Sequence, residues 1–425
     1  SEAIKAPNIV IAGRTGAGAA ALTNATSADG LQIYTATYVA KEGDPEGVIA
    51  FTIDFEDMAS NTGTQVVALT DDDLDGGVTF DETPPFFNQT LGGEAGSVSI
   101  SSNNSNGYTN LAKVGDQVTL SLTSTEAIKV GSNPTVLIND KNAVVTRVGD
   151  TDKIFTATIS LSSISDGDAE IDPLTFLVSG YEDAAGNSGE DVNETTDGSS
   201  VKYDPVTPAL VNVAMTSSNE VNSEYAKADD IITITFNSNE TLKFTDDNGD
   251  GVVDPDATEP LISILGSTAG VTITQPQPNS WQATKTVVSS DDETEVPFSI
   301  TYGDPAGNIA SSPITAVEGN AVTIDRTDPT LTKVDVKAAN PTDSSYVTRD
   351  DEVIITIIAD EAIQTPTVTT SHISESTVTN VDGGLNKKWE ARHTALSGEE
   401  TGLMTFGISI SDLANNGPIT TSSLI

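Results

Sequence analysis

One short turn recurs along this chain and limits what the chain can fold into. Tyr181-Glu-Asp-Ala-Ala-Gly-Asn187 and Tyr302-Gly-Asp-Pro-Ala-Gly-Asn308 are two copies, and residues 55–61 and 411–417 are looser ones. Asp can close a turn on its own backbone, and Gly-Asn tolerates a positive φ angle. Each of the first three copies is followed by an apolar residue, an Asp and, four residues after that Asp, a Pro. The Pro ends a strand because it has no N–H to donate to a neighbouring strand. The repeat therefore predicts a β-hairpin that ends at a stiff joint.

The spacing of these joints predicts whole domains in tandem. Pro85, Pro208 and Pro329 lie 123 and 121 residues apart, which is the size of a complete domain and too long for a small repeat. The predicted domains are 1–81, 82–204, 205–325 and 326–425. Glu2-Ala-Ile4 aligns with Glu126-Ala-Ile128, so we expect the first domain to lack its first strands. The fourth is expected to lack its closing strand.

Within each predicted domain the strands are short and alternate apolar with polar residues. Asp116–Leu122, Asp230–Phe236 and Asp351–Ile358 are matching examples. About seven such strands, separated by a turn every 8–12 residues or so, are typical of an immunoglobulin-like sandwich. The predicted fold is therefore all-β, a tandem array of immunoglobulin-like antiparallel β-sandwiches. An aromatic residue is expected to fill each core (Tyr34, Phe155, Trp281 and Trp389).

The net charge and the cysteine content limit where the protein can be located and which metal sites it can hold. The net charge is −44, from 19 basic and 63 acidic residues, and a field of this sign repels nucleic acid and anionic membranes. Such a charge is tolerated where salt or divalent cations screen it, which favours an extracellular or cell-surface location. The absence of cysteine excludes disulfides and thiolate metal sites. No apolar run approaches the roughly 20 residues of a membrane span, so membrane insertion is not expected.

Two acidic loops match the spacing of calcium sites. Residues 246–254 offer oxygen ligands from Asp246, Asn248, Asp250 and Asp254, with a glycine at the sixth position. The alternative is a solvated acidic insertion. Residues 71–82 fit the same pattern through Asp71, Asp73 and Asp75. Here an ordinary strand turn is the favoured interpretation, because Val78–Phe80 has the pattern of a strand and would carry Glu82 away.

The geometry of a sandwich predicts a further set of carboxylates at each joint. The loop after the second strand and the last hairpin turn share the pole that faces the preceding joint. Glu126 and Asp183 should therefore meet Asp81. Equivalent groups are Glu240 and Asp304 with Asp204, and Glu361 and Asp412 with Asp325. Carboxylates brought together in this way repel unless a cation lies among them. The alternative, left open, is that each Asp serves only its own turn.

The turn and the Val-x-aromatic-Asp-x-x-x-Pro segment that follows it resemble the bacterial Ig-like repeats of large extracellular adhesins and cell-surface proteins. The likeness covers nearly the whole chain. It implies a non-enzymatic spacer or fibre segment, with Ca²⁺ as the predicted cofactor. The alternatives are a self-assembling surface-layer or filament subunit, and a module that binds a glycan or surface ligand, for which Trp389 and the basic residues Lys387 and Lys388 are candidates.

Enzymatic chemistry has little support in the sequence. The chain holds two histidines, His372 and His393, and neither a Gly-x-Ser-x-Gly elbow nor a phosphate-binding glycine loop. No catalytic residue is predicted. The expected partners are neighbouring Ig-like domains of the same or an adjacent chain, and a surface glycan or host surface.

Overall fold

The computed structural model describes residues 2–11, 21–26, 31–67, 77–104, 107–161, 169–243, 259–371, 376–399 and 401–424. These residues are all-β: they contain 32 strands, and no α-helix occurs among them. Within those ranges no helix is long and apolar enough to cross a membrane. The chain divides into two compact units, Ser1–Asn104 with Thr109–Asp204, and Ser105–Tyr108 with Pro205–Ile425.

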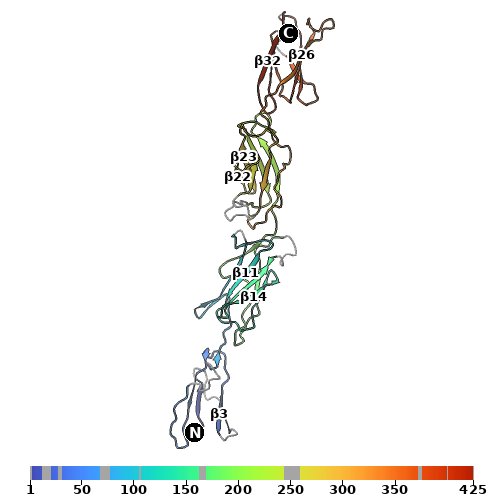
Figure 1. Cartoon of the computed structure of the whole chain (residues 1–425). Helices are drawn as coiled ribbons and strands as arrows, with labels where there is room; N and C mark the ends of the chain where they lie inside the picture. Colours follow the sequence, from blue (N-terminus) through green and yellow to red (C-terminus); the bar gives the residue numbers. More distant parts are fainter. Residues whose placement is uncertain are drawn as a thin grey trace. The chain divides into compact units, whose positions relative to one another are not determined.

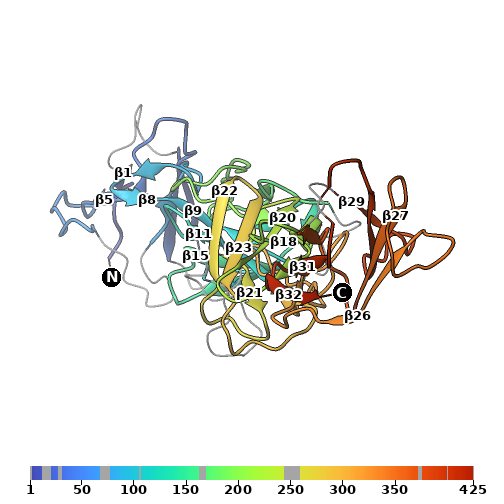
Figure 2. The same ribbon diagram turned by 90° about the horizontal axis from the view of Figure 1, so that it is seen from above.

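The second sandwich, in the first unit, shows how the sequence dictates the fold. Its strands are β7 (Thr90–Leu91), β8 (Glu94–Ala95), β9 (Ser97–Ser102), β10 (Leu111–Ala112), β11 (Gln117–Thr123), β12 (Thr135–Ile138), β13 (Lys141–Asn142), β14 (Val144–Val148), β15 (Ile154–Ser160), β16 (Phe176–Ser179) and β17 (Lys202–Tyr203). One antiparallel sheet has the order β14-β15-β11-β9 and the other β13-β12-β16. Figure 1 labels β11 and β14 of the first of these sheets. Figure 2 shows β9, β11 and β15 side by side.

The two sheets of the second sandwich bury one continuous apolar core between them. Alternate residues of β11 (Val118, Leu120 and Leu122) are buried while their neighbours face outwards, as the period of a strand requires. Phe87 makes edge-on ring contacts with Phe155 and Tyr181, at centroid distances of 6.2 and 4.7 Å. The core is completed by β17, which pairs in parallel with β10 and buries Tyr203.

The third sandwich, in the second unit, repeats this plan. Its strands are β18 (Leu210–Ser217), β19 (Tyr225–Ala226), β20 (Ile231–Ser238), β21 (Leu261–Ile264), β22 (Thr272–Gln277), β23 (Ser280–Thr286), β24 (Phe298–Thr301) and β25 (Thr323–Ile324). The larger sheet has the order β18-β20-β23-β22, β21 pairs with β24, and β25 pairs in parallel with β19. Trp281 stacks on Phe236 inside the core.

The fourth sandwich, also in the second unit, has a four-stranded sheet like those of the other two, and its second sheet has an additional strand, β32, beside β31. Its strands are β26 (Leu331–Ala338), β27 (Glu352–Ala359), β28 (Thr367–Thr370), β29 (Thr377–Asn380), β30 (Lys388–Thr394), β31 (Thr405–Ile410) and β32 (Ile419–Leu424), in the orders β26-β27-β30-β29 and β28-β31-β32. Its core is built around Ile357, Trp389 and Ile408. Among its described residues, no strand takes the place that β17 and β25 hold in the other two.

The first segment, residues 2–81, is a thinner assembly of strand pairs. Its strands are β1 (Asn8–Ile11), β2 (Ala21–Thr26), β3 (Gln32–Thr37), β4 (Gly47–Val48), β5 (Phe51–Asp54) and β6 (Thr79–Phe80), paired as β1-β5, β2-β3 and β4-β6. The bridge between Ile4 and Asp57 matches the bridges Ile128–Asp183 and Ile363–Asp412 of two later copies. Tyr34 is only half-buried, whereas Phe155, Trp281 and Trp389 are buried core residues.

These observations confirm the predicted fold class, a tandem array of immunoglobulin-like antiparallel sandwiches. The positions of the three boundaries between the four predicted domains stay a prediction.

Candidate metal centre

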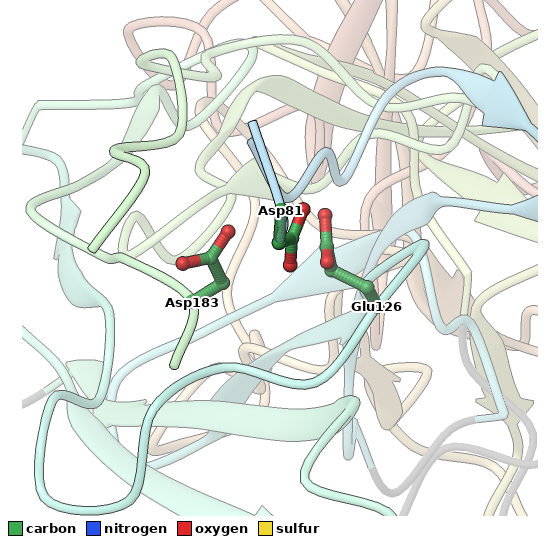
Figure 3. Close-up of side chains that lie close together, drawn as sticks. All are labelled: Asp81, Glu126 and Asp183. Carbon is green, nitrogen blue, oxygen red and sulfur yellow. The ribbon is translucent and has the colours of Figure 1, made fainter. Parts of the chain in front are cut away.

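The structure brings three carboxylates together at the start of the second sandwich. Asp81 follows β6, Glu126 follows β11 and Asp183 lies in the turn after β16. One ligand oxygen from each residue lies within 4.8 Å of the others (Figure 3). Calcium binds carboxylate oxygens at about 2.3–2.6 Å, so three oxygens with this separation can contact one ion.

Each of these side chains is held by local structure. The Asp183 carboxylate accepts hydrogen bonds from Gly186 N (2.7 Å), Asn187 N (2.9 Å) and Asn187 Nδ2 (2.8 Å). Asp81 Oδ1 accepts one from Thr83 N at 3.2 Å. Asp183 therefore does serve its own turn, and it also faces the other two carboxylates. The sequence left open whether each Asp belongs to a carboxylate cluster or serves only its own turn, and for Asp183 both roles are compatible.

Glu126 is the member of the cluster whose carboxylate lacks hydrogen-bond partners most clearly. Its Oε1 atom is buried and has no hydrogen-bond partner. Burial raises the pKa of Glu126 to about 7, and the negative charges of Asp81, Asp183 and Glu46 add to the effect. Lys153 lowers this pKa, but by less than these groups raise it. A buried, unpaired acceptor among carboxylates is the chemical environment that a hard cation would satisfy.

The second unit contains the same arrangement at the start of the fourth sandwich. Asp325 follows β25, Glu361 follows β27 and Asp412 lies in the turn after β31, with ligand oxygens within 4.8 Å of one another. Burial again raises the pKa of Glu361 to about 7, assisted by Asp325 and Asp412. Burial also raises the pKa of Asp81 and of Asp325. Two clusters separated by more than 200 residues thus share residue types, positions and electrostatics.

A fourth carboxylate lies close to each cluster. In the first unit Glu46 accepts hydrogen bonds from Glu82 N (3.2 Å) and Thr83 Oγ1 (2.5 Å). In the second unit Glu293 accepts the equivalent bonds from Arg326 N (3.1 Å) and Thr327 Oγ1 (2.9 Å). Both glutamates belong to acidic stretches of the sequence, residues 42–46 and 291–293, and the sequence alone gives no sign that they hold the joint backbone.

The turn asparagine is a joint residue that sequence reasoning missed. Asn187 Nδ2 donates to the backbone oxygen of Asp81 at 3.2 Å, and Asn416 Nδ2 donates to that of Asp325 at 2.9 Å. Each asparagine therefore links its own turn to the joint before it. Its recurrence in every copy of the turn is the sequence signal that could have suggested this role.

The predicted middle group is divided between the two units. Asp204 is buried in the first unit and forms an ion pair with Lys202 at 3.4 Å. In the second unit Asp304 is buried and accepts hydrogen bonds from Asn308 N and Nδ2 at 2.9 and 2.8 Å, and Ser238 Oγ donates to the backbone oxygen of Glu240. The grouping of Asp204, Glu240 and Asp304 stays a prediction. The loops with Asp71, Asp73, Asp75 and with Asp246, Asn248, Asp250, Asp254 lie outside the described residues.

The suggestion of Trp389 as a ligand-binding residue is wrong. Its ring is buried in the core of the fourth sandwich, and its Nε1 donates to the backbone oxygen of Asn386 at 3.1 Å. Lys387 Nζ is likewise engaged, with the backbone oxygen of Asp360 at 2.8 Å. Trp389 alternates with outward-facing residues on β30, so the pleat of the strand directs it inwards.

Comparison with known proteins gives no family for this chain. No protein-family model matches it, and no curated protein matches it. Among solved structures, a marsupial T cell receptor has a TM-score of 0.28 at 10% identity, over 77% of this chain and 99% of that one. Titin domains A168–A170 have a TM-score of 0.27 at 11% identity, over 81% of this chain and 99% of that one. The protocadherin GammaB4 extracellular domain has a TM-score of 0.25 at 12% identity, over 99% of this chain and 78% of that one. At TM-scores this low, these likenesses carry no argument.

Proposed function

We propose that this chain is a non-enzymatic, extracellular spacer or fibre segment of a large surface adhesin, in which calcium stiffens the joints between sandwiches. One observation carries the proposal: the same three-carboxylate cluster occurs at a joint in each unit, at Asp81–Glu126–Asp183 and Asp325–Glu361–Asp412. The residues after each joint aspartate are short, proline-containing linkers, so a cation there would couple two sandwiches.

The chemistry of the donor set favours calcium among metals. All three ligands in each cluster are carboxylates, which suit hard cations, and neither a histidine nor a sulfur atom belongs to either group. Three carboxylates supply at most six oxygens, and water can complete a coordination shell of 6–8 or so. The net charge of −44 supports a setting rich in divalent cations or salt. The described histidine, His393, pairs with Glu399 at 2.8 Å, a role that fits a structural residue.

Calorimetric titration of the full chain with calcium, after treatment with chelator, tests this proposal. The wild-type chain should bind calcium, and the double variant Glu126→Gln/Glu361→Gln should bind two fewer ions. Glu194→Gln, at an exposed glutamate that belongs to neither cluster, is the matched control and should bind as the wild type does. Any binding that remains in the double variant would belong to the predicted loops or the middle group. Equal stoichiometry in the wild type and the double variant would contradict the proposal.

A further inference from the structure

The turn that carries Asp412 uses its N–H groups and its carbonyl groups for different partners. Asn416 donates to the Asp412 carboxylate through its backbone N and its Nδ2, at 2.8 and 2.7 Å. The backbone oxygens of Ala414 and Asn415 accept hydrogen bonds from the third sandwich, which lies in the same compact unit. The turn is therefore held from outside the fourth sandwich as well as from within it.

Two side chains of the third sandwich donate these bonds. Asn219 Nδ2 donates to the Ala414 oxygen at 2.7 Å, and Lys227 Nζ donates to the Asn415 oxygen at 2.5 Å. Asn219 and Ala414 are both buried, at 8% and 0% exposure, so the hydrogen bond between them is shielded from water. Because a buried acceptor that loses its donor is costly, these two donors favour one position of the turn.

The donor Asn219 is itself fixed in orientation. Its Oδ1 accepts hydrogen bonds from Val221 N at 3.0 Å and Asn222 N at 3.1 Å. Its Nδ2 also donates to Asp230 Oδ2 at 3.2 Å, and the same oxygen accepts a bond from Lys227 N at 2.9 Å. Both donors to the turn therefore belong to one preorganised loop, and Asn219 cannot rotate without losing several bonds.

The second sandwich builds the same loop. Asn104 Nδ2 and Lys113 N both donate to Asp116 Oδ2 at 2.9 Å. The backbone N of Asn104 and that of Asn219 each donate to the hydroxyl of the serine two positions earlier. The sequence signature is Ser-x-Asn followed by Lys-x-x-Asp, at residues 102–116 and 217–230. The second sandwich thus offers a matched position for each of the two donors.

From these contacts we propose that Asn219 and Lys227 are positioning residues for the candidate calcium site of the fourth sandwich. They hold the turn where Asp412 faces Asp325 and Glu361, so that less of the site has to be ordered when an ion binds. The inference rests on the proposed function and adds that the preceding sandwich helps to set the calcium affinity of this joint. By linkage, calcium bound there strengthens the docking of the two sandwiches.

Hydrogen exchange of the full chain in chelator tests whether the loop holds the turn. Asn219→Ala and Lys227→Met should each exchange about fivefold faster than the wild type at residues 412–417, the effect expected from one lost hydrogen bond. Lys227→Arg keeps a charged donor and should restore slow exchange. The matched controls are Asn104→Ala and Lys113→Met, which should leave exchange at 412–417 unchanged. Circular dichroism establishes that each variant is folded.

A calcium titration followed by the same exchange tests the positioning role. Asn219→Ala changes no charge, and the calcium concentration that half-protects residues 412–417 should rise about tenfold or more, as when a residue that orients a metal ligand is lost. Asn104→Ala should keep the wild-type midpoint. An unchanged midpoint in Asn219→Ala would show a purely structural role and overturn the proposal.

Unchanged exchange in chelator in both Asn219→Ala and Lys227→Met would overturn the proposal as well. A wild type whose turn calcium does not protect at any concentration would contradict the proposed function instead. The comparison in chelator still decides in that case whether the loop holds the turn, so the two failures are distinguishable.

Discussion

Glu126 and Glu361 carry most of the unfavourable free energy of the two joint clusters, which comes from desolvation and charge repulsion. Asp183 and Asp412 each accept hydrogen bonds from their own turn, and Asp81 and Asp325 accept one from the residue two positions on. Glu126 Oε1 has no such partner. The glutamates therefore carry the desolvation and repulsion of their clusters, and their pKa values rise furthest, to about 7.

Replacing Glu126 with glutamine should have opposite effects with and without calcium. In chelator, the substitution removes a repelling charge, so the free energy of unfolding should increase by about 1 kcal/mol, a value already reduced for solvent screening of a partly exposed group. In calcium, the variant loses a charged ligand and should gain less stability than the wild type. Chemical denaturation in both media measures the two effects. A variant that is destabilised in chelator would contradict the assignment of Glu126 to a repulsive cluster.

At the scale of elements, the hairpin turn does more than reverse the chain. Gly186 and Gly307 have positive φ angles of 96° and 88°, and Ser60 and Asn415 adopt similar values of 71° and 65° in the looser copies. The turn thus keeps its shape despite sequence changes, and delivers an aspartate to the cluster and an asparagine to the joint.

The asparagine of this turn should determine how firmly each joint is held. Asn416→Ala removes the bond from Nδ2 to the backbone oxygen of Asp325 and the bond to Asp412 Oδ2. We expect a loss of about 1–2 kcal/mol in the unfolding free energy, from two hydrogen bonds of which one is to a charged group. Asn61→Ala breaks the same bond within its own turn, to Asp57, and is the control. Hydrogen exchange should show faster exchange at 326–330 in Asn416→Ala only, and unchanged exchange there would contradict the role.

Turn chemistry and strand period were enough to predict the sandwich fold and the carboxylates that share a pole. The turn and the strands are encoded by local sequence. Asp183 and Asn187 are four residues apart, and the alternation of apolar and polar residues is enough to show which face of β11 is buried. The bonds across the joint were not predicted, because sandwich geometry brings the turn to the joint but does not show which of its atoms reach the linker backbone, as Asn187 Nδ2 reaches the Asp81 oxygen. The repeat position of Trp389 predicted its place in the core correctly, and only the separate suggestion that it binds a ligand, which rested on composition, was wrong.

For the whole molecule, the raised pKa values of the two glutamates make stability depend on pH. Burial and repulsion raise the pKa of both glutamates to about 7 in the folded chain, whereas an unfolded glutamate releases its proton near its ordinary pKa of 4.5. In chelator, stability should therefore be highest below pH 4.5 as far as these groups are concerned, and should fall by roughly 1 kcal/mol per glutamate as the pH rises to 7. The double variant Glu126→Gln/Glu361→Gln should lose this fall, as unfolding midpoints across the pH range would reveal. The same pH dependence in the double variant would assign it to other groups.

The central claim is that calcium, bound at the clusters, stabilises an array whose carboxylates otherwise repel one another. Extracellular modules bind calcium with dissociation constants of about 10⁻⁴–10⁻³ M, so about 5 mM calcium adds roughly 1–2 kcal/mol at each site.

Thermal unfolding of the full chain at pH 7.5, in chelator and in calcium, tests this claim most directly. The wild-type transitions should shift upwards by about 3–8 °C in calcium. In Glu126→Gln/Glu361→Gln that shift should shrink, while Glu194→Gln keeps it in full. Wild-type curves that superimpose in the two media, or a shift of the same size in the double variant, would contradict the account.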